Sequence, residues 1–72
     1  EPLMPMIRVE LIEGRTTEQK RNLAKALTDS FIETCGGKPE SVQVVIQEVS
    51  ADDWATAGVL MSDRIAAAEN KT

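Results

Sequence analysis

Pro5 and Arg15 are the first candidates for chemistry in this chain of 72 residues. A proline at a free amino terminus is a secondary amine, and α-amino groups titrate at roughly 7.7 to 8, within reach of general base chemistry. Arginine holds carboxylates through paired hydrogen bonds and stabilises developing negative charge. Since the chain contains no histidine, acid–base work near neutral pH requires a tuned carboxylate, the thiol of Cys35, a lysine or a chain-terminal amine.

The basicity of Pro5 depends on the residues before it. EPLM precedes Pro5, and the proline nitrogen is then an amide without a basic lone pair. If Met4 is the functional start, residues 1–4 are an artefact of expression or of the assigned gene start, and Pro5 becomes the first residue once Met4 is removed. If the extension is native, this subunit cannot use the proline as a base. The residues alone leave both interpretations open.

Composition excludes several classes of function. The net charge is −4, and Trp54 and Phe31 are the only aromatic residues, which argues against a nucleic-acid partner. No segment approaches the roughly 20 apolar residues of a membrane helix. One cysteine and no histidine exclude an internal disulfide and a thiolate or imidazole zinc cluster, so we expect no metal site of that kind. A lone cysteine without an export signal suggests a cytoplasmic protein.

The pattern of apolar residues predicts a strand, a helix and a second strand. Residues 5–12 alternate, as a half-buried strand does. Thr16 and Gln19 fit a capping box, and a helix over residues 17–35 carries an apolar stripe that ends at Cys35. Gly36 and Gly37 end this helix. The basic residues on the helix flank, Lys20, Arg21 and Lys25, are interpreted as a solvated face.

The second strand is expected over residues 41–49, parallel to the first in a right-handed βαβ crossover. The sequence of residues 50–62 predicts a short 3₁₀ or loop piece and a small hairpin that turns at Gly58. For residues 63–72 it predicts a short helix or a frayed tail. The fold class is therefore α/β (α+β): a single βαβ unit with a short C-terminal hairpin. Because parallel strands are normally covered on both faces, we expect a partner subunit.

Several motifs together resemble the 4-oxalocrotonate tautomerase family: Pro5, LIEGRT, EQKRNL, SVQVVIQEV and DDWATAG. The resemblance runs from Pro5 to about Arg64, which makes residues 5–64 the tautomerase domain and residues 65–72 a C-terminal tail. It implies a tautomerase/MIF-like fold in which two subunits form a four-stranded sheet. It further implies a homohexamer built as a trimer of dimers, with a dimer or a hetero-oligomer as alternatives.

The resemblance also implies cofactor-free interconversion of the enol and keto forms of a small unsaturated 2-keto or 2-hydroxy acid. Pro5 falls at the catalytic proline of the family. Arg15 falls at an arginine that binds a substrate carboxylate and draws electron density, and Trp54 and Ile12 fall at the apolar wall of the pocket.

Gln43 departs from the family pattern, which commonly has a second arginine at this position. An amide can hydrogen-bond an oxygen but supplies no charge, and a lost charge-assisted contact costs about 1.5 to 3 kcal/mol. Efficient turnover of a dicarboxylate is therefore less expected than turnover of a monocarboxylate. The alternative is a non-catalytic or impaired subunit that completes the active site of another chain in a hetero-oligomer.

Overall fold

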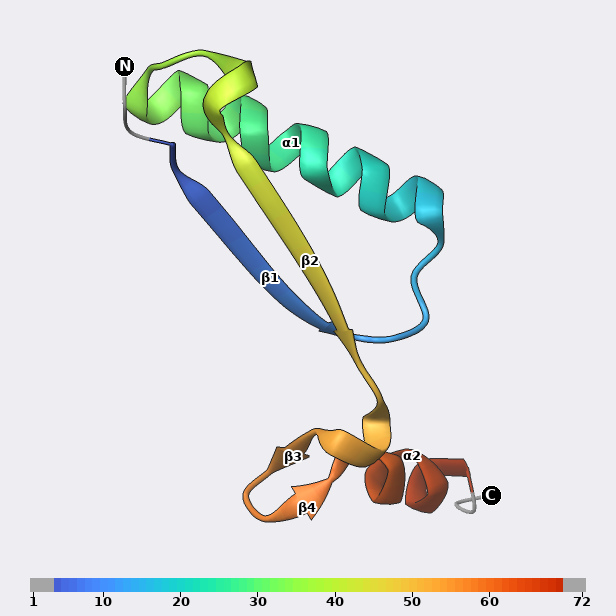
Figure 1. Cartoon of the computed structure of the whole chain (residues 1–72). Coiled ribbons are helices and arrows are strands. Elements are labelled where there is room, and N and C mark those ends of the chain that lie inside the picture. Colours follow the sequence, from blue (N-terminus) through green and yellow to red (C-terminus); the bar gives the residue numbers. More distant parts are fainter. Residues whose placement is uncertain (1–3, 70–72) are drawn as a thin grey trace.

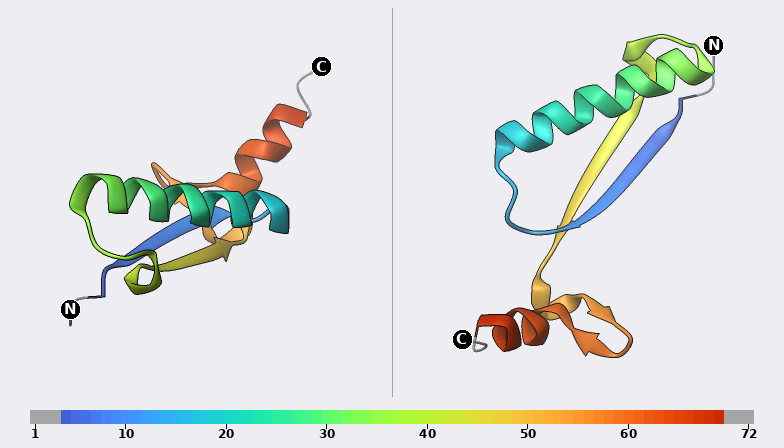
Figure 2. Two further views of the ribbon diagram at one scale, coloured as in Figure 1. Left: turned by 90° about the horizontal axis from the view of Figure 1, so that it is seen from above. Right: turned by 180° about the vertical axis from the view of Figure 1, so that it is seen from behind.

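The structure, a computed structural model, describes residues 4–69 and contains the expected βαβ unit. Strand β1 (Met6–Ile12) leads through a loop into helix α1 (Thr17–Cys35), and β2 (Gln43–Val49) returns parallel to β1. The pairing runs in register from Met6 opposite Gln43 to Ile12 opposite Val49. Helix α1 covers one face of this two-stranded sheet (Figures 1 and 2). The predicted fold class is confirmed.

Helix α1 begins at a complete capping box. The Thr16 side chain accepts the Gln19 N–H at 3.1 Å, and the Gln19 side chain accepts the Thr16 N–H at 2.9 Å. The helix ends where the Gly36 N–H reaches the Ile32 carbonyl at 2.8 Å. Cys35 is exposed, so the prediction that it belongs to the apolar stripe is wrong. As the last residue of the helix, it lies one turn beyond the half-buried Phe31.

Strand β2 begins two residues later than predicted. A 3₁₀ helix, η1 (Pro39–Ser41), precedes it, and the Val42 N–H donates to the Pro39 carbonyl at 3.2 Å. Proline is well suited to the first position of such a turn, because its missing N–H would have no partner there. Ser41 and the β-branched Val42 are thereby held out of the ladder, which begins at Gln43.

The chain continues past β2 through a second 3₁₀ helix, η2 (Ala51–Asp53), into a hairpin of β3 (Ala55–Thr56) and β4 (Val59–Leu60). Ala57 and Gly58 both have positive φ, 55° and 79°, as a tight hairpin turn requires. Helix α2 (Met61–Glu69) follows directly and begins two residues earlier than predicted. The last predicted tail residues, 70–72, lie outside the described residues.

The hairpin and α2 extend away from the βαβ unit instead of packing on it (Figures 1 and 2). The radius of gyration is 16.5 Å, whereas a compact chain of this length has about 11 Å. The accessible surface is 5613 Å², against about 4,400 Å² for a compact protein of this mass. The excess is comparable to the surface that a specific subunit interface buries.

No described residue is fully buried, although the sheet carries apolar side chains on both faces. Ile7 and Val9 face α1, whereas the alternation places Met6 and Ile12 on the opposite face, where nothing in the described chain covers the sheet. Met6 is 54% exposed. A single chain therefore leaves half of its core unformed. Within residues 4–69, neither helix combines the length and the apolar character that crossing a membrane requires.

Candidate active site

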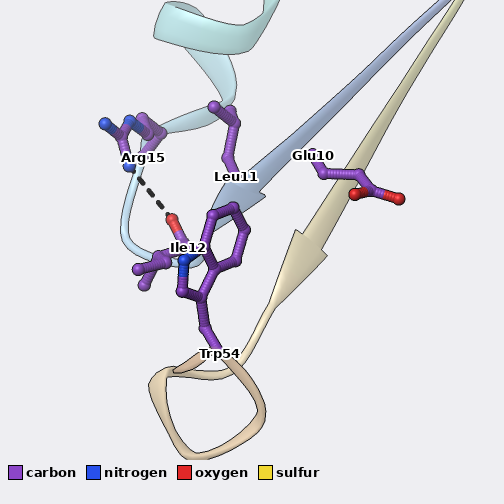
Figure 3. A pocket seen from close by; sticks show the side chains of 5 residues that line it. All are labelled: Glu10, Leu11, Ile12, Arg15 and Trp54. Atoms are coloured by element: carbon purple, nitrogen blue, oxygen red, sulfur yellow. Dashed lines mark hydrogen bonds between the residues drawn. The ribbon is translucent and has the colours of Figure 1, made fainter. Parts of the chain in front are cut away.

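A pocket of about 300 Å³ lies at the carboxyl end of β1, where the strand meets the loop to α1. Three of the predicted site residues, Ile12, Arg15 and Trp54, line it (Figure 3). Glu10 and Leu11 complete the lining. We call this set of residues the Arg15 pocket. The pocket combines an apolar wall with one cation, as a site for a small organic anion requires.

The loop after β1 places Arg15 at the rim of the pocket. Gly14 adopts φ 133°, a conformation that residues with a side chain rarely adopt, and this turns the chain toward the helix. Arg15 donates from Nη1 to the Ile12 carbonyl at 3.0 Å, as Figure 3 shows. A guanidinium has five N–H donors, so donors remain for a carboxylate. Arg15 is also exposed, which leaves it accessible to a ligand.

Trp54 is held by the turn that follows β2. The Ser50 side chain accepts the Asp52 N–H at 3.1 Å and so caps η2. The Met61 N–H donates to the Trp54 carbonyl at 2.7 Å, which ties this turn to the start of α2. The indole of Trp54 lies against the end of β1, beside Ile12 (Figure 3). The described chain after β2, residues 50–69, which we call the hairpin segment, thus supplies the aromatic wall of a pocket whose cation comes from the loop after β1.

Pro5 and Gln43 lie at the opposite end of the sheet. The Gln43 N–H donates to the Pro5 carbonyl at 2.9 Å, which places the two residues side by side. Strand β1, seven residues long, separates them from Arg15 by about 23 Å at 3.3 Å per residue. We call Pro5 and Gln43 the amino-end residues. Within one chain, the structure does not bring the amino-end residues and the Arg15 pocket together (Figure 1).

An ion pair between α1 and β2 lies next to the loop that carries Arg15. Lys20 Nζ is 2.6 Å from a carboxylate oxygen of Glu48, and the two side chains are only 27% and 31% exposed. The interpretation of Lys20 as part of a solvated helix face is therefore wrong: the first turns of α1 pass over the end of β2. The hydrogen bond from Lys20 lowers the pKa of Glu48 below its usual value, against an opposing effect of partial burial. The Lys20 charge, the Gly14 N–H and the Arg15 charge lower this pKa further.

The sequence reasoning missed Glu10, Leu11, Lys20 and Glu48. Alternation gives a signal for Glu10, because it shares the sheet face of Ile12 two residues later. Leu11 belongs to the helix-facing side and reaches the pocket only because the strand ends beside it. The Lys20–Glu48 pair depends on how α1 crosses β2, which no local pattern contains.

Comparison with known proteins gives this geometry a context. The sequence profile of the family described as "Tautomerase enzyme" matches residues 5–64. The chain belongs to the tautomerase family. It is 45% identical over 60 residues to a 2-hydroxymuconate tautomerase of Bacillus subtilis (strain 168), which covers 83% of this chain and 97% of the relative.

Solved structures of tautomerases share the fold. A 4-oxalocrotonate tautomerase isozyme from Methylibium petroleiphilum superposes with a TM-score of 0.85 at 38% identity, over 88% of this chain and 98% of that one. A heterohexamer 4-oxalocrotonate tautomerase from Chloroflexus aurantiacus J-10-fl gives a TM-score of 0.80 at 35% identity, over 83% and 97% of the two chains. The small α+β architecture is thus that of the tautomerases.

Proposed function

We propose that this tautomerase interconverts the enol and keto forms of a small unsaturated 2-keto or 2-hydroxy acid, with the amine of an amino-terminal Pro5 as the general base. The observation that carries the proposal is the Arg15 pocket, in which one accessible cation adjoins the apolar wall of Ile12 and Trp54. Names of relatives such as 2-hydroxymuconate tautomerase support the class of substrate.

The proposed reaction moves one proton and needs no cofactor. In the first step, the Pro5 amine takes the proton of the 2-hydroxyl group. The oxygen electrons form the C2 carbonyl, and the displaced electrons of the conjugated double bonds become available at a carbon further along the substrate. The proline ammonium returns the same proton to that carbon, so that Pro5 ends the cycle as a free amine. Arg15 holds a carboxylate of the substrate and draws electron density toward it, which stabilises the charge that develops between the two steps.

The separation of Pro5 and Arg15 requires that one active site be built from two subunits. The uncovered sheet face, the extended hairpin segment and the excess accessible surface support an oligomer. We propose a hexamer in which two subunits pair into a four-stranded sheet and three such dimers assemble. The heterohexamer from Chloroflexus aurantiacus shows that a similar chain assembles into six subunits. Cytoplasmic localisation stays a prediction.

The decisive experiment is ketonisation of 2-hydroxymuconate and phenylenolpyruvate by a chain that begins at Pro5. Its matched control carries an uncleavable residue before Pro5, which turns the amine into an amide without changing the pocket. We expect turnover only with the free amine, and kcat/KM should rise with pH through the proline pKa, near or below the roughly 7.7 to 8 of an ordinary α-amino group. Pro5→Ala should lower kcat/KM by at least about two decades, since general base catalysis contributes 10²–10⁴-fold.

Equal turnover by the free and blocked chains would refute the proline mechanism. Background rates with both substrates, unchanged by Pro5→Ala, would refute the enzymatic function of the homogeneous protein. That second result would leave the non-catalytic subunit as the better description.

A further inference from the structure

The four-residue loop between β1 and α1 is held at each end by backbone contacts. At its start, the Glu13 N–H donates to the Val49 carbonyl at 3.0 Å. At its end, the capping box fixes Thr16 on the first turn of α1. Gly14 and Arg15 lie between these two points, and the glycine at φ 133° gives this part of the loop the greatest backbone freedom.

Glu48 is the charged side chain that faces this middle part from β2. It lies opposite Leu11 in the register and so projects to the α1 side of the sheet, next to Val49, which holds the start of the loop. Its carboxylate is 2.6 Å from Lys20 Nζ on the first turns of α1. The backbone N–H of Gly14 and the charge of Arg15 both lower the pKa of the same carboxylate. Glu48 is therefore bound to the helix that follows the loop, and it is the strand neighbour of Val49, which holds the start of the loop.

We propose that Glu48, fixed by Lys20, is a positioning residue that sets the loop conformation from which Arg15 reaches the pocket. This inference rests on the proposed function, because it assigns the effect of Glu48 to the substrate-binding role of Arg15. The Lys20–Glu48 pair is more than two-thirds shielded from solvent, so it holds its geometry better than an exposed ion pair. Displacement of a positioning group by about 1 Å can cost 10²-fold in rate.

The chain offers a matched control for the loss of an ion pair. Lys25 and Asp29 form a pair of 2.8 Å on the outer face of α1, with side chains 77% and 60% exposed. This pair has no contact with the loop or the pocket. Asp29→Asn therefore removes a carboxylate from an ion pair without disturbing Arg15, and it should leave turnover unchanged.

The test is a double-mutant cycle on the chain that begins at Pro5, assayed with 2-hydroxymuconate. We expect Glu48→Ala to lower kcat/KM about tenfold, mainly through KM, and to have no further effect in an Arg15→Ala background. The charge swap Lys20→Glu with Glu48→Lys restores the ion pair but removes the carboxylate from the strand. It should recover the thermal midpoint and leave kcat/KM low. Equal losses in both backgrounds would overturn the inference, because Glu48 would then act on the whole fold.

Amide hydrogen exchange gives a readout that does not depend on turnover. Glu48→Ala should accelerate exchange at Gly14 and Arg15, whereas Asp29→Asn should not. Unchanged exchange in Glu48→Ala would overturn the positioning role. If exchange is faster in Glu48→Ala but Arg15→Ala keeps full activity, Glu48 does constrain the loop. That combination would instead refute the role of Arg15 in the proposed function.

Discussion

At the scale of single residues, Gln43 is the position where a change should widen the range of substrates. It lies beside Pro5 at the amino end of the sheet, where an added cation would act close to the proposed base. Gln43→Arg should raise kcat/KM for the dicarboxylate 2-hydroxymuconate by about one to two decades, the value of a charge-assisted hydrogen bond. The monocarboxylate phenylenolpyruvate, assayed alongside, should change much less.

Equal gains for the two substrates would show that the new charge acts on the reaction in general and not on the second carboxylate. Gln43→Lys is the matched control variant, because lysine adds the same positive charge but lacks the paired N–H donors of a guanidinium. It should give a smaller gain than arginine.

Gly14 is a second residue at which a substitution should have a specific effect on stability and turnover. A methyl group at Gly14 would meet no atom within 4 Å, so any cost of Gly14→Ala comes from its backbone conformation. We expect a destabilisation of about 1 kcal/mol or more and, in addition, lower kcat/KM, because the strain is relieved by moving Arg15. Gly37→Ala is the control: Gly37 has φ 102°, and its added methyl group would be 4.0 Å from Ile32, an ordinary contact. If both variants lose stability and turnover alike, Gly14 has no specific effect on Arg15.

The candidate site could be predicted from the sequence where the resemblance to the tautomerases supplied its residues by position. Arg15, Ile12 and Trp54 were predicted together, and the structure places all three around one pocket. Their chemical roles stay predictions. Lys20 was interpreted as solvated and Glu48 was not considered, because the sequence alone does not show which strand a charged residue on a helix crosses.

At the scale of elements, the pairing of α1 with β2 through Lys20 and Glu48 should make stability depend on pH. The pKa of Glu48 is lowered from its ordinary value of 4.5, so the folded state favours the ionised carboxylate. The stabilisation is fully present above that ordinary value and is lost as pH falls through the lower folded pKa. Thermal unfolding of the parent chain and of Glu48→Gln should therefore differ at pH 7, and the difference should shrink as the pH falls below 4.5 and through the lower folded pKa.

A difference in thermal midpoint that does not shrink as the pH falls would mean that the glutamine disturbs packing and not charge. Lys20→Met tests the same pair from the other side. Its difference from the parent chain should close over the same range of pH, because the protonated Glu48 no longer attracts the ammonium.

The elements themselves were predicted well where periodicity is long and caps are explicit. Helix α1 has the predicted bounds, because a capping box and two glycines mark its ends. The starts of β2 and α2 were each displaced by two residues, since the 3₁₀ turn at Pro39 and the tie from Met61 to Trp54 are set by backbone hydrogen bonds. The path of the hairpin segment away from the sheet could not be predicted, because nothing within one chain fixes it.

At the scale of the whole molecule, the structure separates the residues of the proposed active site into two parts that one subunit cannot join. Pro5 lies at the start of β1, and Arg15 lies beyond its end. Pro5→Ala and Arg15→Ala chains should each keep only a small residual activity as homogeneous proteins. When the two are unfolded together in equal amounts and refolded, the mixed oligomers should recover about one quarter of the parent activity per site. This fraction follows because a site that takes one residue from each of two chains is intact in both about one time in four.

Native mass spectrometry of the same sample shows whether mixed oligomers form, and the rate of 2-hydroxymuconate ketonisation measures the recovery. A mixture of Pro5→Ala with the double variant Pro5→Ala, Arg15→Ala contains no intact proline and controls for refolding. Mixed oligomers without recovered activity would mean that Pro5 and Arg15 act from the same chain. Within a single chain, Arg15 would then have to move by about the length of β1, roughly 23 Å, to reach Pro5. The seven paired residues of β1 and β2 do not allow such a movement. Recovery is thus the outcome that the fold demands of any mechanism using both residues.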